Sequence, residues 1–557
     1  MCNSEKNKEI LKLSPVLRRL LLNRGIDENN ISEFLSSKPQ LAYDPFLLAN
    51  MRAGVDLLLN AIDRGKKITV YGDYDADGVT STALLVKVLN SLGADVSYYI
   101  PSRIKEGYGL NKQSIEKLYN TGTEVIVTVD CGISSRAEVE YAEKLGMEVL
   151  VTDHHSISSK LPNSLIIDPK LKTDKYPFKG LAGVGVAYKL SLALNKIRKV
   201  PSRIMLEALE LTAIGTVADI MPLIGENRTI VKCGLRLIHL GCRNKGLSAL
   251  IRRAGFDYKK MKSSGISFGI APRINAAGRV GDALVAVRLF LSEDGCEIEK
   301  CCNELIRANE YRRKLQNEAF NRCIEKAVIE KQKGDFLIIE DNIHEGVLGI
   351  VAGKLREHFN RPVAVITECS EGLKGSARSI PSVDLFSLLC RNEELFINFG
   401  GHKAACGFTL EKEKLKKLKK VLNKDMKELY EKDSSIFKKK YEYEMELLPT
   451  QVDMNLAEEI ELLEPCGMEN ENPVFCFRNI TPENWYMKND GSYAKFTIST
   501  ENDKKVGCIL FHDVFAFYDI YIAEHKVDII GSIEINCWRN KKSVQINVES
   551  IAPCGII

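Results

Sequence analysis

The chain has no long hydrophobic run. Its first residues, Met-Cys-Asn-Ser-Glu-Lys-Asn-Lys, lack the apolar centre of a signal peptide, and no stretch approaches the roughly 18 apolar residues of a membrane span. Cysteine pairs at metal-ligand spacing are also missing: none of the 16 cysteines forms a Cys-x-x-Cys motif, and Cys301 and Cys302 are adjacent. We therefore predict a cytoplasmic protein with no membrane segment, whose cysteines are reduced thiols that fill gaps in its cores.

A surplus of either charge is absent too. The 78 Lys and Arg residues against 74 Asp and Glu residues give a formal net charge of +4, so the whole-molecule field neither supports nor excludes nucleic acid as a partner. Binding of a polyanion would depend on a local arrangement of positive groups. Hydrophobic content of 45% and charged content of 27% are typical of a folded protein, and 557 residues predict about two to four domains.

The most informative stretch that is present is an acidic turn, Gly72–Gly78. The apolar run 68–71 leads into it and a helical pattern comes directly after it, which predicts strand, tight turn and helix. Asp73, Asp75 and Asp77 alternate within the turn. Carboxylates this close repel one another unless a cation compensates them, and dense oxygen ligands favour Mg²⁺ or Mn²⁺. Taken alone, the turn could equally be a solvated acidic loop.

Residues 66 to about 170 alternate between β-type and helical patterns. The β-type runs are 67–71, 95–100, 124–130, 148–153 and 164–168, and the helical segments between them are 80–92, 113–119 and 135–145. Near-continuous Val and Ile runs separated by helices indicate strands buried on both faces. We therefore predict an α/β fold with a parallel, doubly wound sheet.

The rest of the chain divides by pattern. Residues 171–282 are mainly helical, and we interpret the glycine cluster 180–185 as a helix start or as packing glycines, since no β-run leads straight into it. A charged helix, 297–331, joins this lobe to a second α/β lobe. From about 441, short β-type runs with no helices between them predict a small barrel or sandwich. The predicted units are an N-terminal helical segment 1–60 that packs onto the next unit, a first lobe 61–282, a connecting helix 283–333, a second lobe 334–433 and a β domain 434–557.

Further Asp and His residues stand where other elements of the first lobe end: Asp130, Asp153, His154, His155 and Asp219. The carboxyl ends of neighbouring parallel strands meet at one edge of a sheet, so these side chains should lie close to the acidic turn. Each Asp could be a helix cap, but several ends that carry only Asp and His favour a metal site, with Mn²⁺ or Mg²⁺ preferred over Zn²⁺. Two such ions about 4 Å apart can activate water and hold a phosphoryl oxygen, so the residues predict phosphoester hydrolysis.

These motifs resemble the four motifs of the DHH phosphoesterase superfamily: Gly72–Gly78, Asp130, Asp153-His154-His155 and Asp219. Further segments resemble its RecJ-type branch of single-strand-specific 5′→3′ DNA exonucleases and the associated DHHA1 lobe: 101–110, 273–279, 375–378 and 400–402. The resemblance runs from about residue 45 to the C-terminus. It implies a DHH lobe joined by a long helix to a DHHA1 lobe, followed by an OB-fold β-barrel. Segment 464–473 resembles a RecJ hinge, with Cys466 and Glu469 where Phe and Gly are expected.

Carried over residue by residue, the resemblance implies two Mn²⁺ or Mg²⁺ ions. Asp75 and Asp130 would hold one ion, and Asp77, Asp130, His154 and Asp219 the other. Asp73 would be a further ligand or a group that supports the ligands from behind, Asp153 would orient an imidazole, and His155 would contact the scissile phosphate or act as general acid. Tyr71 occupies a position where small pyrophosphatases of the superfamily have His, which predicts that one ion is held more weakly or completed by water.

Eight residues are candidates for binding the substrate: Arg103, Tyr108, Arg273, Asn275, Arg279, Ser376, Arg378 and His402. Guanidinium groups match phosphate oxygens, and a tyrosine between two glycines could stack on a base. Each arginine alone could instead be a surface ion pair, and His402 could be structural. Three aromatic residues fit either an OB-fold that binds single strands or the core of its barrel: Tyr493, Phe496 and Trp538.

The resemblance implies single-stranded DNA as substrate, single-stranded-DNA-binding protein and a helicase as partners, and a monomeric chain that acts in DNA repair and recombination. Two alternatives stay open. One is a DHH phosphodiesterase that acts on oligoribonucleotides or cyclic dinucleotides, and the other is a non-catalytic replication scaffold derived from this fold. The intact set of Asp and His residues argues against the scaffold, and the third domain argues against the small phosphodiesterases.

Overall fold

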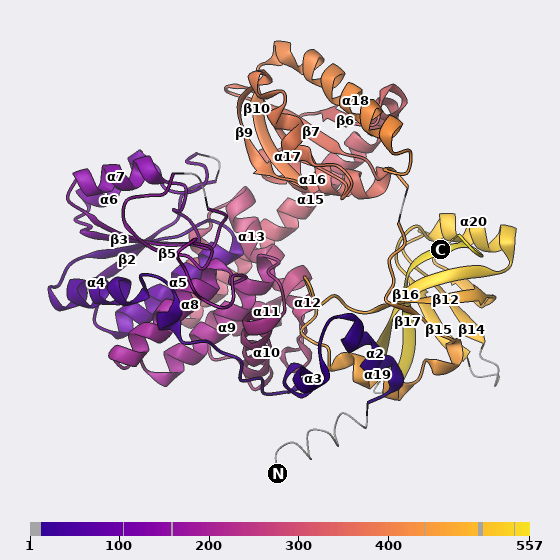
Figure 1. Ribbon diagram of the computed structural model, residues 1–557, viewed down its shortest axis with the longest axis horizontal. Coiled ribbons are helices and arrows are strands. Elements are labelled where there is room, and N and C mark those ends of the chain that lie inside the picture. Colours follow the sequence, from indigo (N-terminus) through magenta and orange to yellow (C-terminus); the bar gives the residue numbers. More distant parts are fainter. Residues whose placement is uncertain are drawn as a thin grey trace.

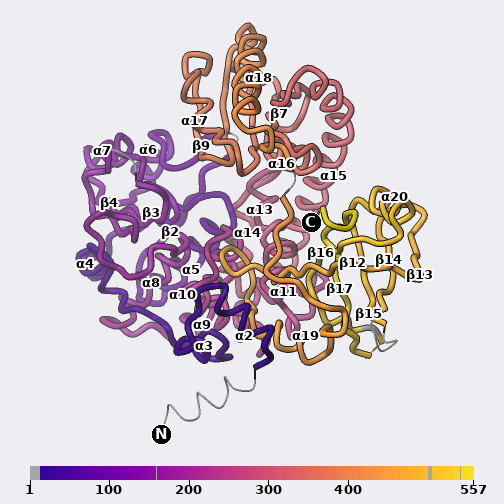
Figure 2. Tube along the Cα trace, turned by 45° about the vertical axis from the view of Figure 1, so that its right-hand side comes forward, coloured from indigo at the N-terminus to yellow at the C-terminus, as the bar shows by residue number. Residues whose placement is uncertain are grey.

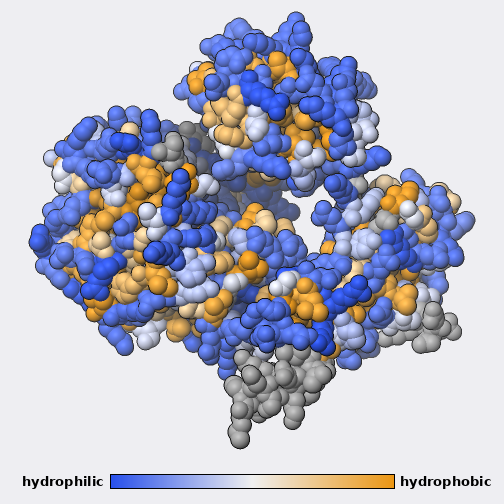
Figure 3. Space-filling view, in the orientation of Figure 1, coloured by the Kyte–Doolittle hydropathy of each residue, from blue (hydrophilic) through white to orange (hydrophobic). Residues whose placement is uncertain are grey.

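The computed structural model describes residues 13–103, 105–157, 160–438, 440–499, 505–539 and 541–556. Three lobes surround an opening (Figures 1 and 3): an N-terminal α/β lobe, a second α/β lobe that the long helix α15 joins to it, and a β-rich C-terminal lobe. This architecture confirms the predicted fold class. Among the residues described, no helix combines the length and the apolar character needed to cross a bilayer.

The sheet of the first lobe is parallel and lies between two helical layers. Its strand order is β2-β1-β3-β4-β5. Strand β3 shows how the sequence specifies this: Val125, Val127 and Val129 face the core beside α5, whereas Ile126 faces the core beside α6 and α7. Strands β1 to β5 span Ile68–Tyr71, Val96–Tyr99, Val125–Val129, Glu148–Thr152 and Leu165–Ile167, and α6 and α7 span Lys112–Asn120 and Arg136–Lys144.

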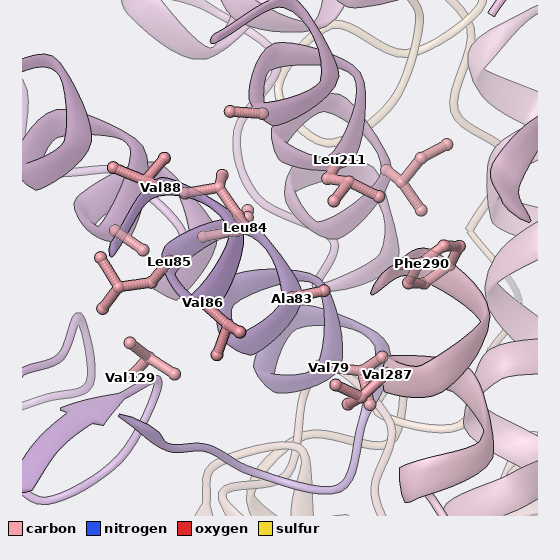
Figure 4. Close-up of a cluster of buried hydrophobic side chains, with 14 of the residues drawn as sticks. Val79, Ala83, Leu84, Leu85, Val86, Val88, Val129, Leu211, Val287 and Phe290 are labelled. Carbon is pink, nitrogen blue, oxygen red and sulfur yellow. The ribbon is translucent and has the colours of Figure 1, made fainter. Parts of the chain in front are cut away.

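Helix α5, Ala76–Ser91, is buried along most of its length because it is packed on the sheet and covered by further helices. Figure 4 shows side chains of α5 between Val129 of β3, Leu211 of α9 and Phe290 of α14. The helix begins at Ala76, earlier than the predicted residue 80. The reason is that the Asp75 carboxylate accepts hydrogen bonds from two backbone N–H groups of the first turn and caps the helix.

Helices α8 (Gly183–Ile197), α9 (Ser202–Ala218), α13 (Ala271–Val280) and α14 (Leu284–Leu291) pack on α5 and bring the later part of the chain back to the sheet. The other helical elements of this lobe are α4 (Met51–Asp63), α10 (Gly225–His239), α11 (Lys245–Arg253), α12 (Ser263–Gly265) and the π-helical turn η3 (Ile266–Ile270). The start of α8 at Gly183 confirms that the glycine cluster opens a helix. The stretch 283–333 contains two helices, α14 and α15 (Gly295–Lys333), because the Asp294 carboxylate caps a new helix after a break.

The second lobe is a mixed sheet with strand order β6-β7-β8-β10-β9. Its strands span Leu337–Glu340, Val363–Cys369, Gly372–Arg378, Phe396–His402 and Ala405–Leu410 for β6 to β10, with helices α16 (Leu348–Phe359), α17 (Leu385–Cys390) and α18 (Leu415–Lys432). Helix α18 buries Leu418, Leu422 and Met426 on one face. Its lysines therefore lie on the remaining, solvated surface, as the pattern predicts.

The C-terminal lobe has a seven-stranded sheet of order β11-β12-β16-β17-β15-β14-β13. Strands β11 to β17 span Met445–Glu446, Val474–Ile480, Pro482–Met487, Ala494–Ser499, Lys505–Leu510, Val527–Trp538 and Lys541–Pro553. The prediction that no helix interrupts these strands is wrong, because α20 (Val514–Glu524) lies between β15 and β16. Tyr521 of α20 stacks on Trp485, which also stacks on the buried Phe496. Phe496 is thus a core residue; the side chain of Trp538 lies outside the described residues.

The N-terminal helices do not pack only on the first lobe. Leu17, Leu20 and Leu21 of α2 (Pro15–Asn23) and Ile31 of α3 (Glu28–Leu35) share a core with the C-terminal lobe. Figure 2 shows α2 beside α19 (Met454–Glu461) of that lobe. Helix α4 and the 3₁₀ turn η1 (Pro45–Leu47) before it pack instead on the core of the first lobe. The two ends of the chain therefore form one unit, which a local reading of residues 1–60 could not detect.

Arg228 of α10 ties this unit to the first lobe. Its guanidinium is buried and donates hydrogen bonds to five backbone carbonyls, those of Phe34 and of residues 462–465. It also lies 3.8 Å above the Phe34 ring. In the adjoining hinge segment Glu469 has a φ of 59°, which explains why a glycine is expected there.

We expect Arg228→Leu to lower the free energy of unfolding by about 3 kcal/mol, because several buried carbonyls lose their donors at once. Urea unfolding followed by fluorescence measures the loss. Arg236→Leu, an exposed position on the same helix, is the control and should change stability by less than about 0.5 kcal/mol. Equal effects of the two substitutions would contradict the role of Arg228.

Candidate metal centre

The carboxyl ends of β1, β3 and β4 meet because the three strands are neighbours in the sheet. The structure brings together seven of the eight predicted catalytic and metal-binding side chains in three overlapping groups whose ligand atoms lie within 4.8 Å of one another. The groups are Asp73, Asp75 and Asp130; Asp77, His154 and Asp219; and Asp130, His154 and His155. Asp130 and His154 each belong to two groups, so the groups form one continuous centre.

The acidic turn is held in place by both neighbouring helices. The backbone N–H of Ala76 donates to the Asn275 side-chain oxygen of α13 at 2.7 Å. Asp77 accepts hydrogen bonds from the N–H groups of Gly183 and Val184, at 2.8 Å each, at the N-terminus of α8. A helix N-terminus stabilises a carboxylate, so α8 fixes the orientation of Asp77 before any cation binds.

Asp130 lies at the middle of the centre and adopts a left-handed φ of 60°. This conformation is uncommon for a residue with a side chain and turns its carboxylate toward the acidic turn. Gly183 makes the position possible, because a Cβ at residue 183 would lie 2.6 Å from the Cβ of Asp130. The Oδ1 atom of Asp130 is buried and has no hydrogen-bond partner. Such an orphaned acceptor beside further carboxylates fits a cation site.

The His154 side chain points its Nε2 atom at three carboxylates. This atom lies 3.1 Å from Asp130, 3.5 Å from Asp219 and 3.8 Å from Asp77. Burial, followed by the charge of His155, lowers the pKa of His154 to about 3. The ring is therefore neutral near pH 7, which is the form that binds a metal ion.

Asp153 holds His155 rather than facing the other carboxylates. Its Oδ1 atom accepts hydrogen bonds from His154 N–H and from His155 Nδ1, both at 2.7 Å, and its Oδ2 atom accepts one from Ile133 N–H. Burial lowers the pKa of His155, but the hydrogen bond and the charge of Asp153 outweigh it and raise the pKa to about 9. The Tyr108 hydroxyl lies 3.2 Å from the same Nδ1 atom. His155 is thus a cation at neutral pH.

Crowding changes the acidity of the carboxylates. Burial first, and then the charge of neighbouring carboxylates, raise the pKa values of Asp73, Asp77 and Asp130 well above the usual range of an Asp. The same causes raise the pKa of Asp219 to about 7. Oxygen ligands at this density, with one imidazole, fit hard divalent cations such as Mn²⁺ and Mg²⁺.

We expect Mn²⁺ to raise the melting temperature of EDTA-treated protein more at pH 8 than at pH 6. A carboxyl whose pKa is raised by folding stabilises the folded protein fully below its unfolded pKa, near 4, and this stabilisation is lost as pH rises through its folded pKa, about 7 for Asp219. Repulsion among the ionised carboxylates of the metal-free centre is therefore greatest at high pH. A cation that relieves it should contribute about 3 kcal/mol at 100 times its dissociation constant. Scanning calorimetry at both pH values, with KCl of equal ionic strength as control, tests this; a pH-independent rise would contradict it.

Three predicted substrate-binding arginines gather beside the centre. Arg103 lies over the Tyr74 ring at 5.0 Å, and burial together with the charges of Arg103 and Arg312 lowers the pKa of Arg279 to about 10. Arg279 donates to the Gly346 carbonyl of the second lobe at 3.2 Å. On β8, Arg378 donates to the Ser376 hydroxyl at 3.1 Å and lies in the field of Arg103. These groups bring positive charge from both lobes to the edge of the centre.

Other predicted residues are placed differently. Arg273 donates to the Gly269 carbonyl at 2.5 Å on the side of α13 that faces α15, and the exposed His402 has no described contact with the centre. Tyr71 is fully buried, and its hydroxyl donates to the Gly109 carbonyl at 3.0 Å rather than pointing to the acidic turn. Asn275 accepts a hydrogen bond from the backbone of the acidic turn, so in this structure it positions that turn.

Two neighbours of the centre were not among the predicted site residues. Asp168, directly after β5, is fully buried with an unpartnered Oδ2 atom, and burial raises its pKa to about 7. Lys170 lowers the pKa values of Asp219 and Asp168 by its charge. The signal for Asp168 was present in the sequence, since it comes directly after a strand of the same sheet as Asp130 and Asp153 do.

Comparison with known proteins accounts for all three lobes. Residues 67–216 match the model of the DHH family, N-terminal domain; residues 330–428 match the DHHA1 domain; and residues 443–550 match the RecJ OB domain. The single-stranded-DNA-specific exonuclease RecJ of Bacillus subtilis is 36% identical over 555 residues, which cover 98% of this chain and 69% of that protein. The Escherichia coli protein of the same name is 36% identical over 488 residues, covering 83% of each chain.

Solved structures agree with these relatives. The crystal structure of RecJ in complex with Mn²⁺ from Thermus thermophilus superposes with a TM-score of 0.81 at 30% identity, covering 97% of this chain and 76% of that one. A crystal structure of exonuclease RecJ bound to manganese superposes with a TM-score of 0.60 at 37% identity, covering 68% and 95%. On identity, coverage and domain content together, the chain belongs to the RecJ family.

Proposed function

We propose that this protein is a metal-dependent exonuclease specific for single-stranded DNA, which hydrolyses phosphodiester bonds from the 5′ end and releases 5′-mononucleotides. The observation that carries the proposal is the convergence of Asp77, Asp130, His154 and Asp219 on one point at the edge of the sheet. RecJ relatives are named for this activity, and a related structure contains Mn²⁺. The 5′ polarity rests on the family resemblance.

The residues present fit a pair of divalent cations. Asp73, Asp75 and Asp130 would hold one ion, and Asp77, His154 and Asp219 the other, with Asp130 between the two groups. When bound, such cations lower the pKa of water and neutralise charge on a phosphoryl group. The unpartnered Oδ1 of Asp130 and the neutral His154 ring are the features of this chain that suit them.

The remaining groups would bind and orient the phosphate. His155, protonated and held by Asp153, can donate a hydrogen bond to a phosphate oxygen or a proton to the leaving oxygen. Arg103, Arg279 and Arg378 would neutralise the backbone near the reacting phosphate. Tyr108 donates to the Asp130 carbonyl at 3.2 Å and supports both His155 and the strained backbone at Asp130.

The alternative substrate classes are less well supported. A phosphodiesterase for short oligoribonucleotides would not need the RecJ OB domain at residues 443–550, which extends the chain beyond the two catalytic lobes. A non-catalytic scaffold would not need the complete set of acidic ligands. We also propose that the protein acts as a monomer in the cytoplasm, with single-stranded-DNA-binding protein and a helicase as partners. We propose further that the chain divides as predicted near residues 333 and 433, while α4 and α14 belong to the first lobe.

One incubation series tests the proposal. End-labelled single-stranded DNA, double-stranded DNA and RNA are each mixed with the protein in Mn²⁺, Mg²⁺ or EDTA, and products are resolved on a sequencing gel. We expect mononucleotides from the 5′ end of single-stranded DNA only, and no product in EDTA. Preferential loss of short RNA would favour the oligoribonuclease, and the absence of turnover with every substrate would favour the scaffold.

A further inference from the structure

A face of α15 carries positive charge that the described residues leave without an acidic partner. Asn309, Arg312 and Gln316 succeed one another at the three- and four-residue spacing that places side chains on the same face of a helix, and Arg313 adjoins this row, four residues after Asn309 and three before Gln316. The Arg312 guanidinium donates to the Gln316 side chain at 2.8 Å and to the Asn309 side chain at 2.6 Å. Both amides are buried and neutral, so they orient the guanidinium without cancelling its charge.

Arg273 of α13 extends this set. Its hydrogen-bond acceptor is the neutral Gly269 carbonyl, and its buried Nε atom has no partner among the described atoms. Burial, and after it the positive charge of Arg313, lowers the pKa of Arg273. Burial, and after it the charges of Arg313 and Arg273, lowers the pKa of Arg312. The three groups therefore lie in one another's fields. Within the described part of the chain, none of them is within ion-pair distance of a carboxylate; Glu310 is the acidic group that acts on Arg273.

The position of these cations connects them with the metal centre. On α13, Arg279 lies beside the centre, and Arg273 lies six residues earlier, or about 9 Å along the helix. In Figure 1, α13 and α15 border the opening between the three lobes, and Figure 3 shows that side chains do not close it. A strand whose end reached the centre could thus continue past these arginines. Repelling cations held together by neutral acceptors are stabilised when an anion joins them.

We propose that Arg312 and Arg313 of α15, with Arg273 of α13, form a binding site for backbone phosphates of single-stranded DNA away from the metal centre. The inference rests on the proposed function and adds to it the segment of the strand that is not being cleaved. Guanidinium groups suit this task because they present several donors to phosphate oxygens and remain charged when partly buried. Phosphate contacts carry no base specificity, as suits an enzyme that digests any sequence.

The test measures binding apart from catalysis. Fluorescence anisotropy of a labelled 20-nucleotide single strand is recorded in EDTA at several KCl concentrations for wild type, Arg313→Gln, Arg312→Gln/Arg313→Gln and Lys314→Gln. Lys314 is the matched control, since it is the next residue on α15 and lies near Glu318 at 4.0 Å. Mn²⁺-dependent hydrolysis of a trinucleotide reports that the metal centre is intact in every variant.

We expect Arg313→Gln to weaken binding several-fold at 0.1 M salt and to reduce the slope of log affinity against log salt by about 0.7, with a larger effect for the double variant. Lys314→Gln should change neither quantity, and trinucleotide hydrolysis should stay unchanged. If wild type degrades the strand and the double variant binds it with unchanged affinity and an unchanged salt slope, this inference alone is overturned. Equal losses for Arg313→Gln and Lys314→Gln would also overturn it, because they would reflect net charge only. Wild type that neither binds nor degrades the strand would overturn the proposed function as well.

Discussion

Asp130→Asn is expected to reduce hydrolysis of single-stranded DNA by about 10⁴-fold or more, the scale seen when a member of a catalytic unit is removed. Asp130 is shared by two ligand groups, and its Oδ1 atom lies 3.1 Å from His154 Nε2. Gly183 packs directly against Asp130, since a Cβ at residue 183 would lie 2.6 Å from the Asp130 Cβ. Single-turnover rates in saturating Mn²⁺ measure the loss.

The same substitution should not unfold the protein. Burial and the charges of Asp77 and Asp75 raise the pKa of Asp130, so replacing it with a neutral amide relieves repulsion in the metal-free protein. We expect the EDTA-treated variant to melt no lower than wild type and to gain less stability from Mn²⁺. Asp56→Asn, an exposed position on α4 of the same lobe, is the control and should leave the rate unchanged. Activity of Asp130→Asn within tenfold of wild type would refute the assignment of the centre.

His155→Gln is expected to slow hydrolysis by about 10²- to 10⁴-fold, the range for loss of a general acid or base. Asp153 affects the reaction through His155, so Asp153→Asn should lower the rate of hydrolysis by a factor that depends on pH. Without the Asp153 carboxylate, the His155 pKa should fall from about 9 toward the ordinary value near 6.5. The ring would then be mainly neutral at pH 8 but largely protonated at pH 6. If the protonated ring is required, the variant should lose more activity at pH 8 than at pH 6.

A pH–rate profile of Asp153→Asn from pH 6 to 9 provides the measurement. A merely structural role of Asp153 would lower the rate by the same factor at every pH, so parallel profiles for variant and wild type would contradict the proposal. Asp174→Asn offers a control, because Asp174 is another buried carboxylate that accepts backbone hydrogen bonds, from Ala49 and Tyr176, away from the centre. It should reduce stability without changing the shape of the profile.

The acidic residues could be found from sequence because their position obeys a local rule. Asp130 and Asp153 come directly after Val-rich strands, and parallel strands bring such ends to one edge. Asp168 obeys the same rule and was not selected, because no motif marks it. For Tyr71 the local rule misleads. Its position beside the acidic turn suggests a metal ligand, but strand alternation turns its side chain into the core beside α6 and α7.

Long-range packing was beyond local patterns. Helix α2 has the amphipathic pattern of a surface helix, but the pattern does not say which core receives Leu17 and Leu20. Helix α20 was missed because a run rich in aromatic and β-branched residues fits a strand equally well, and only packing of Val514 and Phe517 on the sheet decides between them. The separation of α14 from α15 likewise depends on one capping residue, Asp294.

By itself, the sequence determined the class of the fold, the order of its lobes and the identity of the acidic and imidazole groups at the metal centre. These features depend on periodicity and on residues a few positions apart, where chain geometry leaves few choices. Only the tertiary structure decided that Gly183 and Val184 orient Asp77, that Asn275 holds the acidic turn, and that Arg228 binds the two ends of the chain to the first lobe. Such contacts join residues roughly 100 to 240 positions apart, and no local pattern of side chains encodes which partner a buried donor or acceptor will meet.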